Sequence, residues 1–291
     1  MLQTILCASD NNYAQHLGIM LFSLLSNAKR PEGYEIIIIN DSIENCNLEK
    51  IKKTIERYHA SYRILDADLS KVEGLASFSY ISKAMYFRIF IDEYLDENYQ
   101  RVLYLDSDMI ISDDISDLFI LDMKGFEIAA VPDAHVFRNE KIELKKRLGI
   151  NKREDYFNSG LLLIDLEKYR SADIKNRVFS FIKNSSDKLY FPDQDALNYV
   201  LHDRYLKLPI TYNFQSAMKK HQLESNGYPK VIHYTGHAKP WFYFKKHPIK
   251  KAYLHYKKRS LWSEEKAVDL TFKNVLFSLF FMKNKISFYS K

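Results

Sequence analysis

The sequence predicts an α/β fold in which helices cover a doubly wound, mostly parallel sheet. Two observations lead to this prediction: apolar runs of strand length alternate with segments of helical periodicity, and the connections between them are short. Consecutive β and α units of this kind build parallel sheets through right-handed crossovers. The 291 residues can bury one large core or two small ones.

The N-terminal half shows the alternation clearly. "TILCAS" (4–9) and "YEIIIIND" (34–41) are continuous apolar runs, which is typical of strands that a parallel sheet buries on both faces. Between them, leucine and methionine recur at helical spacing over 17–25, which predicts a helix. The same criteria predict a helix at 48–60, a strand at 62–68, a helix at 82–95 and a strand at 101–111.

The C-terminal half is less regular. Strands are expected at 126–133, 160–166 and 230–236, and a helix at 193–202 has acidic residues in its first turn, as the helix dipole favours. Near Pro240 aromatic residues and lysines replace the α/β pattern, and 263–285 resembles an amphipathic helix with basic flanks. We therefore expect a main domain at 1–244 and a basic, aromatic, helical tail at 245–291.

Aspartates follow several of the predicted strands. Asp10, Asp41, Asp66 and Asp106 each come after an apolar run. The carboxyl ends of parallel strands meet at one edge of a sheet, where α/β proteins bind their ligands. We expect these four side chains near that edge.

Two carboxylate positions stand out together in "RVLYLDSDMII" (101–111). If this segment is one strand, Asp106 and Asp108 point the same way, and burying both as ions needs a positive partner. One interpretation is a turn in which both aspartates accept hydrogen bonds from backbone N–H groups. The other is a pair of oxygen ligands for Mn²⁺ or Mg²⁺.

"HYTGHAKPW" (233–241) supplies groups that fit the second interpretation. His233 ends an apolar strand and offers an imidazole nitrogen to the same metal, although a single histidine is more often structural. Gly236 permits close backbone approach to a phosphate, and Lys239 carries a charge that neutralises one.

Five separated motifs occur together in this chain. They are "ASDNNYA" (8–14), "YFRIF" (86–90), "YLDSDMII" (104–111), "FNSGLLLID" (157–165) with "DQDALN" (193–198), and "HYTGHAKPW" (233–241). In these motifs and their order the sequence resembles the retaining glycosyltransferases of family 8, over about residues 1–245. This family includes bacterial lipooligosaccharide galactosyltransferases, related glucosyltransferases and the glycogenins. The resemblance implies the GT-A fold, a Rossmann-like mixed sheet flanked by helices.

The resemblance also implies a role for each matched residue. Uracil and ribose would be held by Ala8, Asp10, Asn12 and Tyr13, with the Ser107 backbone near the ribose. Mn²⁺, with Mg²⁺ as the alternative, would be bound by Asp106, Asp108 and His233. The rest of the donor would be contacted by Arg88 at the diphosphate or sugar hydroxyls, Asn158 and Gly160 at the sugar, and Gly236 and Lys239 over the diphosphate.

The reaction implied by the family retains the anomeric configuration of the sugar. Asp193 and Gln194 would face the donor sugar, and Asp133 matches an aspartate near the reaction centre. Gln194 occupies the position of a nucleophile, but an amide oxygen is a poor one. We therefore favour transfer on one face of the sugar, with Gln194 stabilising the sugar cation and Asp193 binding sugar hydroxyls.

Each motif also has a purely structural interpretation. Asp10 to Asn12 could cap the first helix, the 157–160 segment could be an ordinary turn, and Asp193 and Asp195 could cap the helix that they begin. Arg88 on a helix usually forms a surface ion pair. These interpretations do not explain the shared order of the five motifs.

Charge is distributed unevenly along the chain. The net charge is +6, yet nine of the 43 Lys and Arg residues lie between Ser225 and Ser263, where there is no Asp or Glu. The rest of the chain has 34 positive and 37 negative residues, so the excess of positive charge is confined to this segment. This confinement to one segment predicts a docking element rather than a nucleic-acid-binding fold. The tail is interpreted either as an appendage packed on the body with its lysines in solvent, or as an element that contacts anionic lipid through lysines and aromatic residues.

The cellular compartment is predicted from cysteine usage and hydropathy. Two cysteines form no disulfide framework, which favours a reducing cytoplasm. The N-terminus lacks the pattern of a signal peptide, and the apolar run "VLFSLFFM" is too short to span a bilayer. We expect a cytoplasmic protein whose tail contacts the inner face of the cell membrane.

The leading functional hypothesis is a metal-dependent transferase that moves galactose or glucose from a UDP-sugar to a glycan or glycoconjugate. The alternatives are a catalytically silent UDP-sugar- or glycan-binding protein on the same fold, a nucleic-acid-binding protein that uses the tail, and a metal-dependent nucleotidyltransferase. The complete Asp106, Asp108 and His233 set argues against the first alternative. Confinement of the charge to the tail argues against the second, and the other motifs do not support the third.

Overall fold

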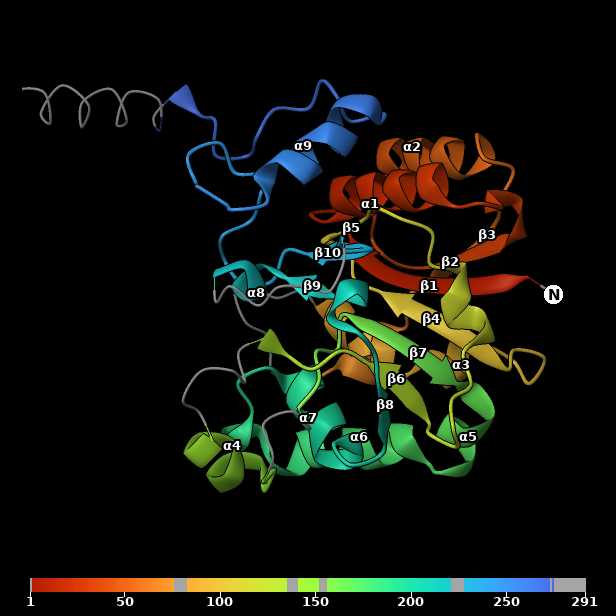
Figure 1. Ribbon diagram of the computed structural model, residues 1–291, viewed down its shortest axis with the longest axis vertical. Helices are drawn as coiled ribbons and strands as arrows, with labels where there is room; N and C mark the ends of the chain where they lie inside the picture. The colour runs from red at the N-terminus through yellow and green to blue at the C-terminus, as the bar shows by residue number, and fades with distance from the viewer. Residues whose placement is uncertain are drawn as a thin grey trace, which may run out of the picture.

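The computed structural model is described here for residues 2–75, 83–134, 141–151, 156–220, 228–272 and 274. In these residues the chain forms a seven-stranded sheet with the order β3-β2-β1-β4-β7-β6-β8 and a three-stranded sheet with the order β5-β10-β9 (Figure 1). The large sheet contains β1 (Gln3–Asp10), β2 (Tyr34–Asp41), β3 (Ser61–Asp66), β4 (Arg101–Leu105), β6 (Ile128–Ala130), β7 (Leu161–Asp165) and β8 (Tyr205–Lys207). The small sheet contains β5 (Met109–Ile111), β9 (Phe214–Gln215) and β10 (Val231–His233).

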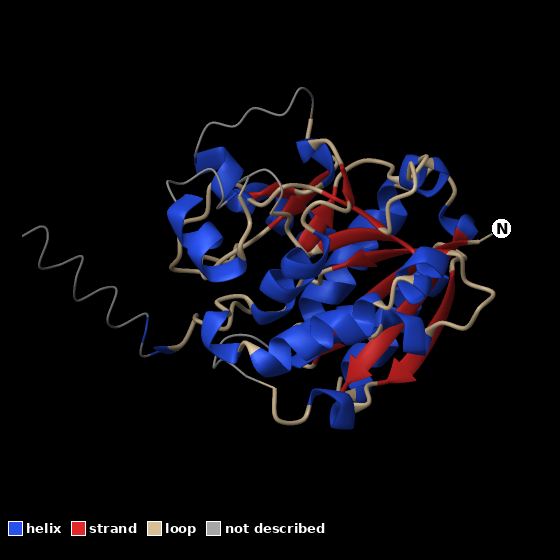
Figure 2. Ribbon diagram, turned by 90° about the horizontal axis from the view of Figure 1, so that it is seen from below, coloured by secondary structure: helices blue, strands red, loops and turns tan. Residues whose placement is uncertain are grey.

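Helices cover both faces of the large sheet (Figure 2). One face carries α1 (Ala14–Asn27), α2 (Asn45–Glu56) and α9 (Lys250–Arg259), and the other carries α3 (Ile91–Tyr94), α5 (Leu166–Ser171), α6 (Ile174–Asn184) and α7 (Pro192–Leu201). The remaining helices are α4 (Lys141–Leu148) and α8 (Ser216–Lys220). Successive residues of β1 alternate between two cores, because Ile5 and Cys7 pack with α1 whereas Leu6 and Ala8 pack against the opposite face. The predicted α/β fold is confirmed.

Strand β7 is the exception to the parallel arrangement. The register of β4 with β7 and of β6 with β7 is antiparallel, and the other pairs of the large sheet are parallel. Because β7 runs in the opposite direction, its first residues lie at the edge where the other strands end. Asp10 pairs with Asp41, and Asn40 pairs with Asp66, so those aspartates also reach this edge as predicted.

Two predicted elements differ from the structure. The strand predicted at 101–111 is two strands in different sheets: β4 pairs with β1, β5 pairs with β10, and Asp106 to Asp108 form the turn between them. The helix predicted at 82–95 is a 3₁₀ segment, Lys83–Ile89, followed by the short α3. Residues 84–89 are all buried, so packing on every side decides the local conformation.

The C-terminal tail packs on the body over its first part. Tyr253, Tyr256 and Trp262 are buried in the same core as α1, and Figure 1 shows α9 lying beside α1. The ring of Trp262 occupies the space above Gly18, where a Cβ atom would come within 2.0 Å of it. These aromatic residues are therefore enclosed by protein, as in the packed-appendage interpretation.

The rest of the predicted tail differs or lies outside the described residues. Residues 263–271 form turns and irregular structure instead of the start of a helix, and the predicted helix beyond 274 lies outside the described residues. No helix among the described residues is long and apolar enough to cross a bilayer. The domain boundary at 244/245 and the contact with a membrane stay predictions.

Candidate functional site

A cleft of about 820 Å³ opens at the edge where β1, β4 and β6 end and β7 begins. Of the residues singled out in the sequence, the cleft is lined by Ala8, Asp10, Tyr13, Arg88, Asp106, Ser107, Asp108, Asp133, Asn158, Asp193, Gln194, His233, Gly236 and Lys239. Asn12 is exposed and lies outside this lining, and Gly160 lies beneath it. Residues of all five motifs, which are far apart in the sequence, thus line the same cleft.

Three candidate metal ligands meet at the centre of the cleft. One oxygen each from Asp106 and Asp108 and one ring nitrogen of His233 lie within 4.8 Å of one another. Nε2 of His233 is 3.2 Å from Asp108 Oδ1 and 3.8 Å from Asp106 Oδ2. The β5–β10 pairing sets His233 opposite Met109, directly after the turn that carries the aspartates. Two carboxylates and an imidazole are a donor set that fits Mn²⁺.

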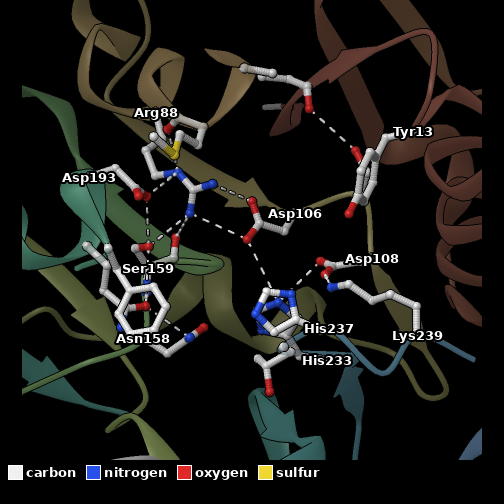
Figure 3. Close-up of a pocket in the computed structure, with 18 of the residues that line it drawn as sticks. Tyr13, Arg88, Asp106, Asp108, Asn158, Ser159, Asp193, His233, His237 and Lys239 are labelled. Carbon is white, nitrogen blue, oxygen red and sulfur yellow. Dashed lines mark hydrogen bonds and ion pairs between the residues drawn. The ribbon is translucent and has the colours of Figure 1, made fainter. Parts of the chain in front are cut away.

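Two cations hold these aspartates (Figure 3). Arg88 Nη2 donates to Asp106 Oδ1 at 2.7 Å, and Arg88 Nε lies 3.2 Å from Asp193 Oδ2. Lys239 Nζ donates to Asp108 Oδ2 at 2.5 Å. These five side chains carry three negative and two positive charges, so one negative charge is left over. That surplus favours binding of a further cation.

The two aspartates have different protonation tendencies. Burial raises the pKa of Asp106 above its ordinary value, although the Arg88 guanidinium opposes the effect. Burial would raise the pKa of Asp108 as well, but Lys239 and His233 outweigh it and hold that pKa below the ordinary range. Asp108 is therefore firmly ionised at neutral pH.

Arg88 is not the surface ion pair that a helical arginine usually forms. It is buried, its Nη1 donates to the carbonyl of Ser159 at 2.8 Å and to Ser159 Oγ at 2.9 Å, and its Nε donates to the Met85 carbonyl. Its guanidinium also lies 4.7 Å from the Tyr104 ring centroid. Arg88 thus joins a candidate metal ligand to the end of the cleft formed by Asp193.

Gly160 makes room for the candidate metal ligands. A Cβ atom there would lie 2.4 Å from Cε1 of His233 and 2.7 Å from Oδ2 of Asp106. The Gly160 carbonyl also accepts a hydrogen bond from the Asp106 N–H at 2.8 Å. Gly160 therefore packs against the ligands, whereas the sequence resemblance implied contact with the sugar.

The opposite end of the cleft is a buried polar network. Asp133 Oδ2 accepts from Asn158 Nδ2 at 3.0 Å and from Gln194 Nε2 at 3.1 Å. Gln194 Oε1 in turn accepts from Asn158 Nδ2 and from the Ser159 N–H, both at 3.0 Å. Ser159 Oγ donates to Asp193 Oδ2 at 3.1 Å. The three predicted catalytic residues are brought together here.

The residues predicted to bind the nucleotide surround the end of β1. Asp10 Oδ1 accepts a hydrogen bond from the Tyr13 N–H at 3.0 Å, so Asp10 supports the start of α1 while it lines the cleft. The Tyr13 ring packs edge-on against Trp241, and Trp241 stacks on His16 with ring centroids 3.6 Å apart. This stack joins the end of the cleft beside β1 to α9, because His16 Nδ1 lies 2.7 Å from the hydroxyl of Tyr253.

Several site residues were not singled out from the sequence. Ser159 lies inside a quoted motif, so that motif could have indicated it. Asn213, whose Oδ1 is 3.0 Å from His233 Nδ1, follows the 3₁₀ turn Ile210–Tyr212 and carries no sequence signal of its own. Aromatic residues Tyr190, Phe191 and Phe242 also line the cleft.

Comparisons with known proteins show what this chain is similar to. The family model of glycosyl transferase family 8 matches residues 4–245. General stress protein A of Bacillus subtilis is 32% identical over 274 residues, covering 89% of this chain and 94% of that protein. Lipopolysaccharide 1,2-glucosyltransferase of Escherichia coli K12 is 29% identical over 272 residues, covering 89% of this chain and 79% of that protein.

Solved structures show the same fold. The galactosyltransferase LgtC, in complex with donor and acceptor sugar analogues, superposes with a TM-score of 0.79 at 23% identity, covering 89% of this chain and 96% of that chain. GlyE of Streptococcus pneumoniae superposes with a TM-score of 0.68 at 23% identity, covering 98% of this chain and 64% of that chain. The architecture is that of GT-A glycosyltransferases.

Proposed function

Because this chain belongs to glycosyltransferase family 8, we propose that it transfers a hexose from a UDP-sugar to a glycan or glycoconjugate acceptor with retention of anomeric configuration. The observation that carries the proposal is the convergence of Asp106, Asp108 and His233 in the cleft, between a nucleotide end and a polar sugar end. Tyr13, Asp10 and Ala8 hold the uridine, with Ser107 beside the ribose. Asn12, which is exposed, contacts the ribose from the rim of the cleft.

Asp106, Asp108 and His233 hold the divalent cation, which is Mn²⁺ or Mg²⁺. When bound, this ion neutralises negative charge on the diphosphate as the sugar leaves. Lys239 adds a positive charge at the same place, because its ammonium already lies against Asp108 and the Tyr234 carbonyl. Gly236, with φ of +79°, lets the backbone approach the diphosphate closely. The developing charge on the leaving group is stabilised by these preorganised groups.

The sugar end of the cleft favours transfer on one face. The hydrogen bonds that Gln194 Oε1 accepts, from Asn158 and from the N–H and hydroxyl of Ser159, hold the amide in place and reduce its nucleophilicity. Gln194 therefore stabilises positive charge on the sugar, and Asp193 and Asp133 bind hydroxyl groups. The bond between the anomeric carbon and the diphosphate breaks, the acceptor oxygen bonds to that carbon, and its proton passes to the diphosphate oxygen.

The donor sugar is galactose or glucose. One relative is named a glucosyltransferase and one structural neighbour a galactosyltransferase, and the two hexoses differ in one hydroxyl group. Asp193, which is buried at the sugar end, is the group that distinguishes that hydroxyl, and Asn158 holds Asp133 and Gln194 in place beside it.

Release of UDP from a panel of UDP-sugars tests the proposal. The purified protein is incubated with UDP-galactose, UDP-glucose and UDP-N-acetylglucosamine in Mn²⁺, in Mg²⁺ and in EDTA. We expect release from one hexose donor that stops in EDTA and falls by about 100-fold or more in Asp108→Asn. Asp203→Asn, at an exposed position outside the cleft, serves as the matched control.

Two results would contradict the proposal. Full activity of Asp108→Asn in EDTA would remove the metal from the reaction. Binding of UDP-sugars without release of UDP, in the presence of varied glycan acceptors, would instead support the catalytically silent binding protein.

A further inference from the structure

A line of buried side-chain amides joins the candidate metal site to the sugar end of the cleft. His233, Asn213, Asn158 and Gln194 are each linked to the next by a hydrogen bond of 2.9 to 3.0 Å. All four side chains are buried, so none of these bonds competes freely with water. We propose that Asn213 is a positioning residue that selects which imidazole nitrogen of His233 faces the two aspartates and couples that choice to Gln194.

The orientation of Asn158 is fixed by a backbone donor. Its Oδ1 lies 3.1 Å from the N–H of Gly160, and a backbone N–H only donates, so this atom must be the amide oxygen. Its Nδ2 then faces Gln194 Oε1, which the Ser159 N–H independently identifies as an oxygen because it donates to that atom. Two independent partners therefore give the same orientation.

The orientation of Asn213 follows from that of Asn158. Asn158 Oδ1 can only accept, so the atom of Asn213 at 2.9 Å from it must be Nδ2, which donates. The remaining atom, Oδ1, lies 3.0 Å from His233 Nδ1. An amide oxygen cannot donate, so Nδ1 of His233 must carry a hydrogen.

Because Nδ1 is held by Asn213, Nε2 is the ring nitrogen that is available to a cation. Nε2 is the nitrogen that lies 3.2 Å from Asp108 Oδ1. A metal-binding histidine is commonly held in this way, by a bond from its other ring nitrogen to an acceptor in the surroundings. Asn213 thus orients the ring and prepares Nε2 to bind a cation.

The same line of bonds extends to the predicted catalytic glutamine. Asn158 Nδ2, fixed on the side of Asp133, also donates to Gln194 Oε1, and the Ser159 N–H donates to the same oxygen. Loss of the hydrogen bond from Asn213 Nδ2 to Asn158 Oδ1 would therefore let the Asn158 amide move, and with it the hydrogen bond that Asn158 donates to Gln194. This coupling to catalysis rests on the proposed function, whereas the orientation of His233 does not.

Two substitutions at Asn213 separate these effects. Asn213→Leu removes both hydrogen bonds in a side chain of similar size. Asn213→Asp keeps an acceptor for His233 Nδ1 but replaces the donor to Asn158 by a second acceptor, which places two oxygens against each other. Asn184→Leu, at an exposed position on α6, is the matched control.

Imidazole ¹⁵N spectra of the metal-free protein read the position of the hydrogen directly. The histidine signals are assigned with His233→Gln, and wild type is expected to show a hydrogen on Nδ1 of His233. Asn213→Asp should keep that pattern and Asn213→Leu should lose it. A His233 Nδ1 that carries no hydrogen in wild type would overturn the inference, even if neither variant folds.

Mn²⁺ binding, measured by calorimetry without any donor, is the second readout. Asn213→Leu should bind Mn²⁺ about 10–100-fold more weakly than wild type. Asn213→Asp should retain metal affinity yet lose transfer activity, and the control should match wild type. Unchanged Mn²⁺ affinity in folded Asn213→Leu would overturn the inference but leave the proposed function standing. If wild type bound neither Mn²⁺ nor Mg²⁺, the proposed function would fail, and the ¹⁵N spectra would decide the inference alone.

Discussion

Gly160→Ala introduces a single carbon atom between two candidate metal ligands. The added Cβ would lie 2.4 Å from Cε1 of His233 and 2.7 Å from Oδ2 of Asp106. The imidazole ring or the aspartate must move by about 1 Å to reach an ordinary carbon contact, at a cost to folding stability of about 1–3 kcal/mol. Metal–ligand distances tolerate shifts of only about 0.2 Å, so the effect on metal binding should exceed the effect on folding.

A displacement of this size should reduce turnover about 100-fold, since catalysis depends on positioning to within about 1 Å. UDP release and urea unfolding are measured on Gly160→Ala and on Gly33→Ala, whose added Cβ would meet nothing within 4 Å. Gly33→Ala should resemble wild type in both assays. Wild-type metal-dependent turnover in Gly160→Ala would refute the assignment of this glycine to the ligand site.

Three further substitutions test the packing around the cleft. Arg88→Met leaves Asp106 and Asp193 without their shared cation, so the free energy of unfolding should fall by about 3–5 kcal/mol; an unchanged urea midpoint would contradict this. Trp262→Ala empties a fully enclosed site beside α1 and should cost about 3–5 kcal/mol in the same assay. If it instead altered vesicle binding with no loss of stability, the packed-appendage interpretation would be wrong. Burial lowers the pKa of His16 from 6.5 to about 3, and the unfolded chain binds this proton more readily. The free energy of unfolding should therefore decrease as the pH is lowered from about 6.5 to about 3, by up to about 1.4 kcal/mol per pH unit. His16→Gln should flatten that dependence.

The parallel half of the fold could be predicted from local patterns alone. Runs such as 34–41 are apolar at every central position because the sheet buries both of their faces, and that signal is unambiguous. The division of 101–111 into β4 and β5 could not be predicted. Apolar residues lie on both sides of the Asp106–Asp108 turn, and only the pairing of β5 with β10, more than 100 residues away, shows that the sheets differ.

The residues of the candidate site that lie in local motifs could likewise be predicted from the sequence, whereas those placed by distant contacts could not. Motif order identified Asp106, Asp108 and His233, because each lies inside a motif that carries the resemblance to the family. Asn213 was missed because its partners, His233 and Asn158, are 20 and 55 residues away along the chain. The reversal of β7 that brings Asn158 to the cleft is likewise a property of the whole sheet.

Calorimetric titration of UDP into the wild-type protein, with Mn²⁺ and then with EDTA, tests the central claim most directly. If the two carboxylates and the imidazole of this site bind a divalent cation together with UDP, UDP binding should weaken at least about tenfold when the metal is removed. Equal affinity for UDP in Mn²⁺ and in EDTA would contradict the account.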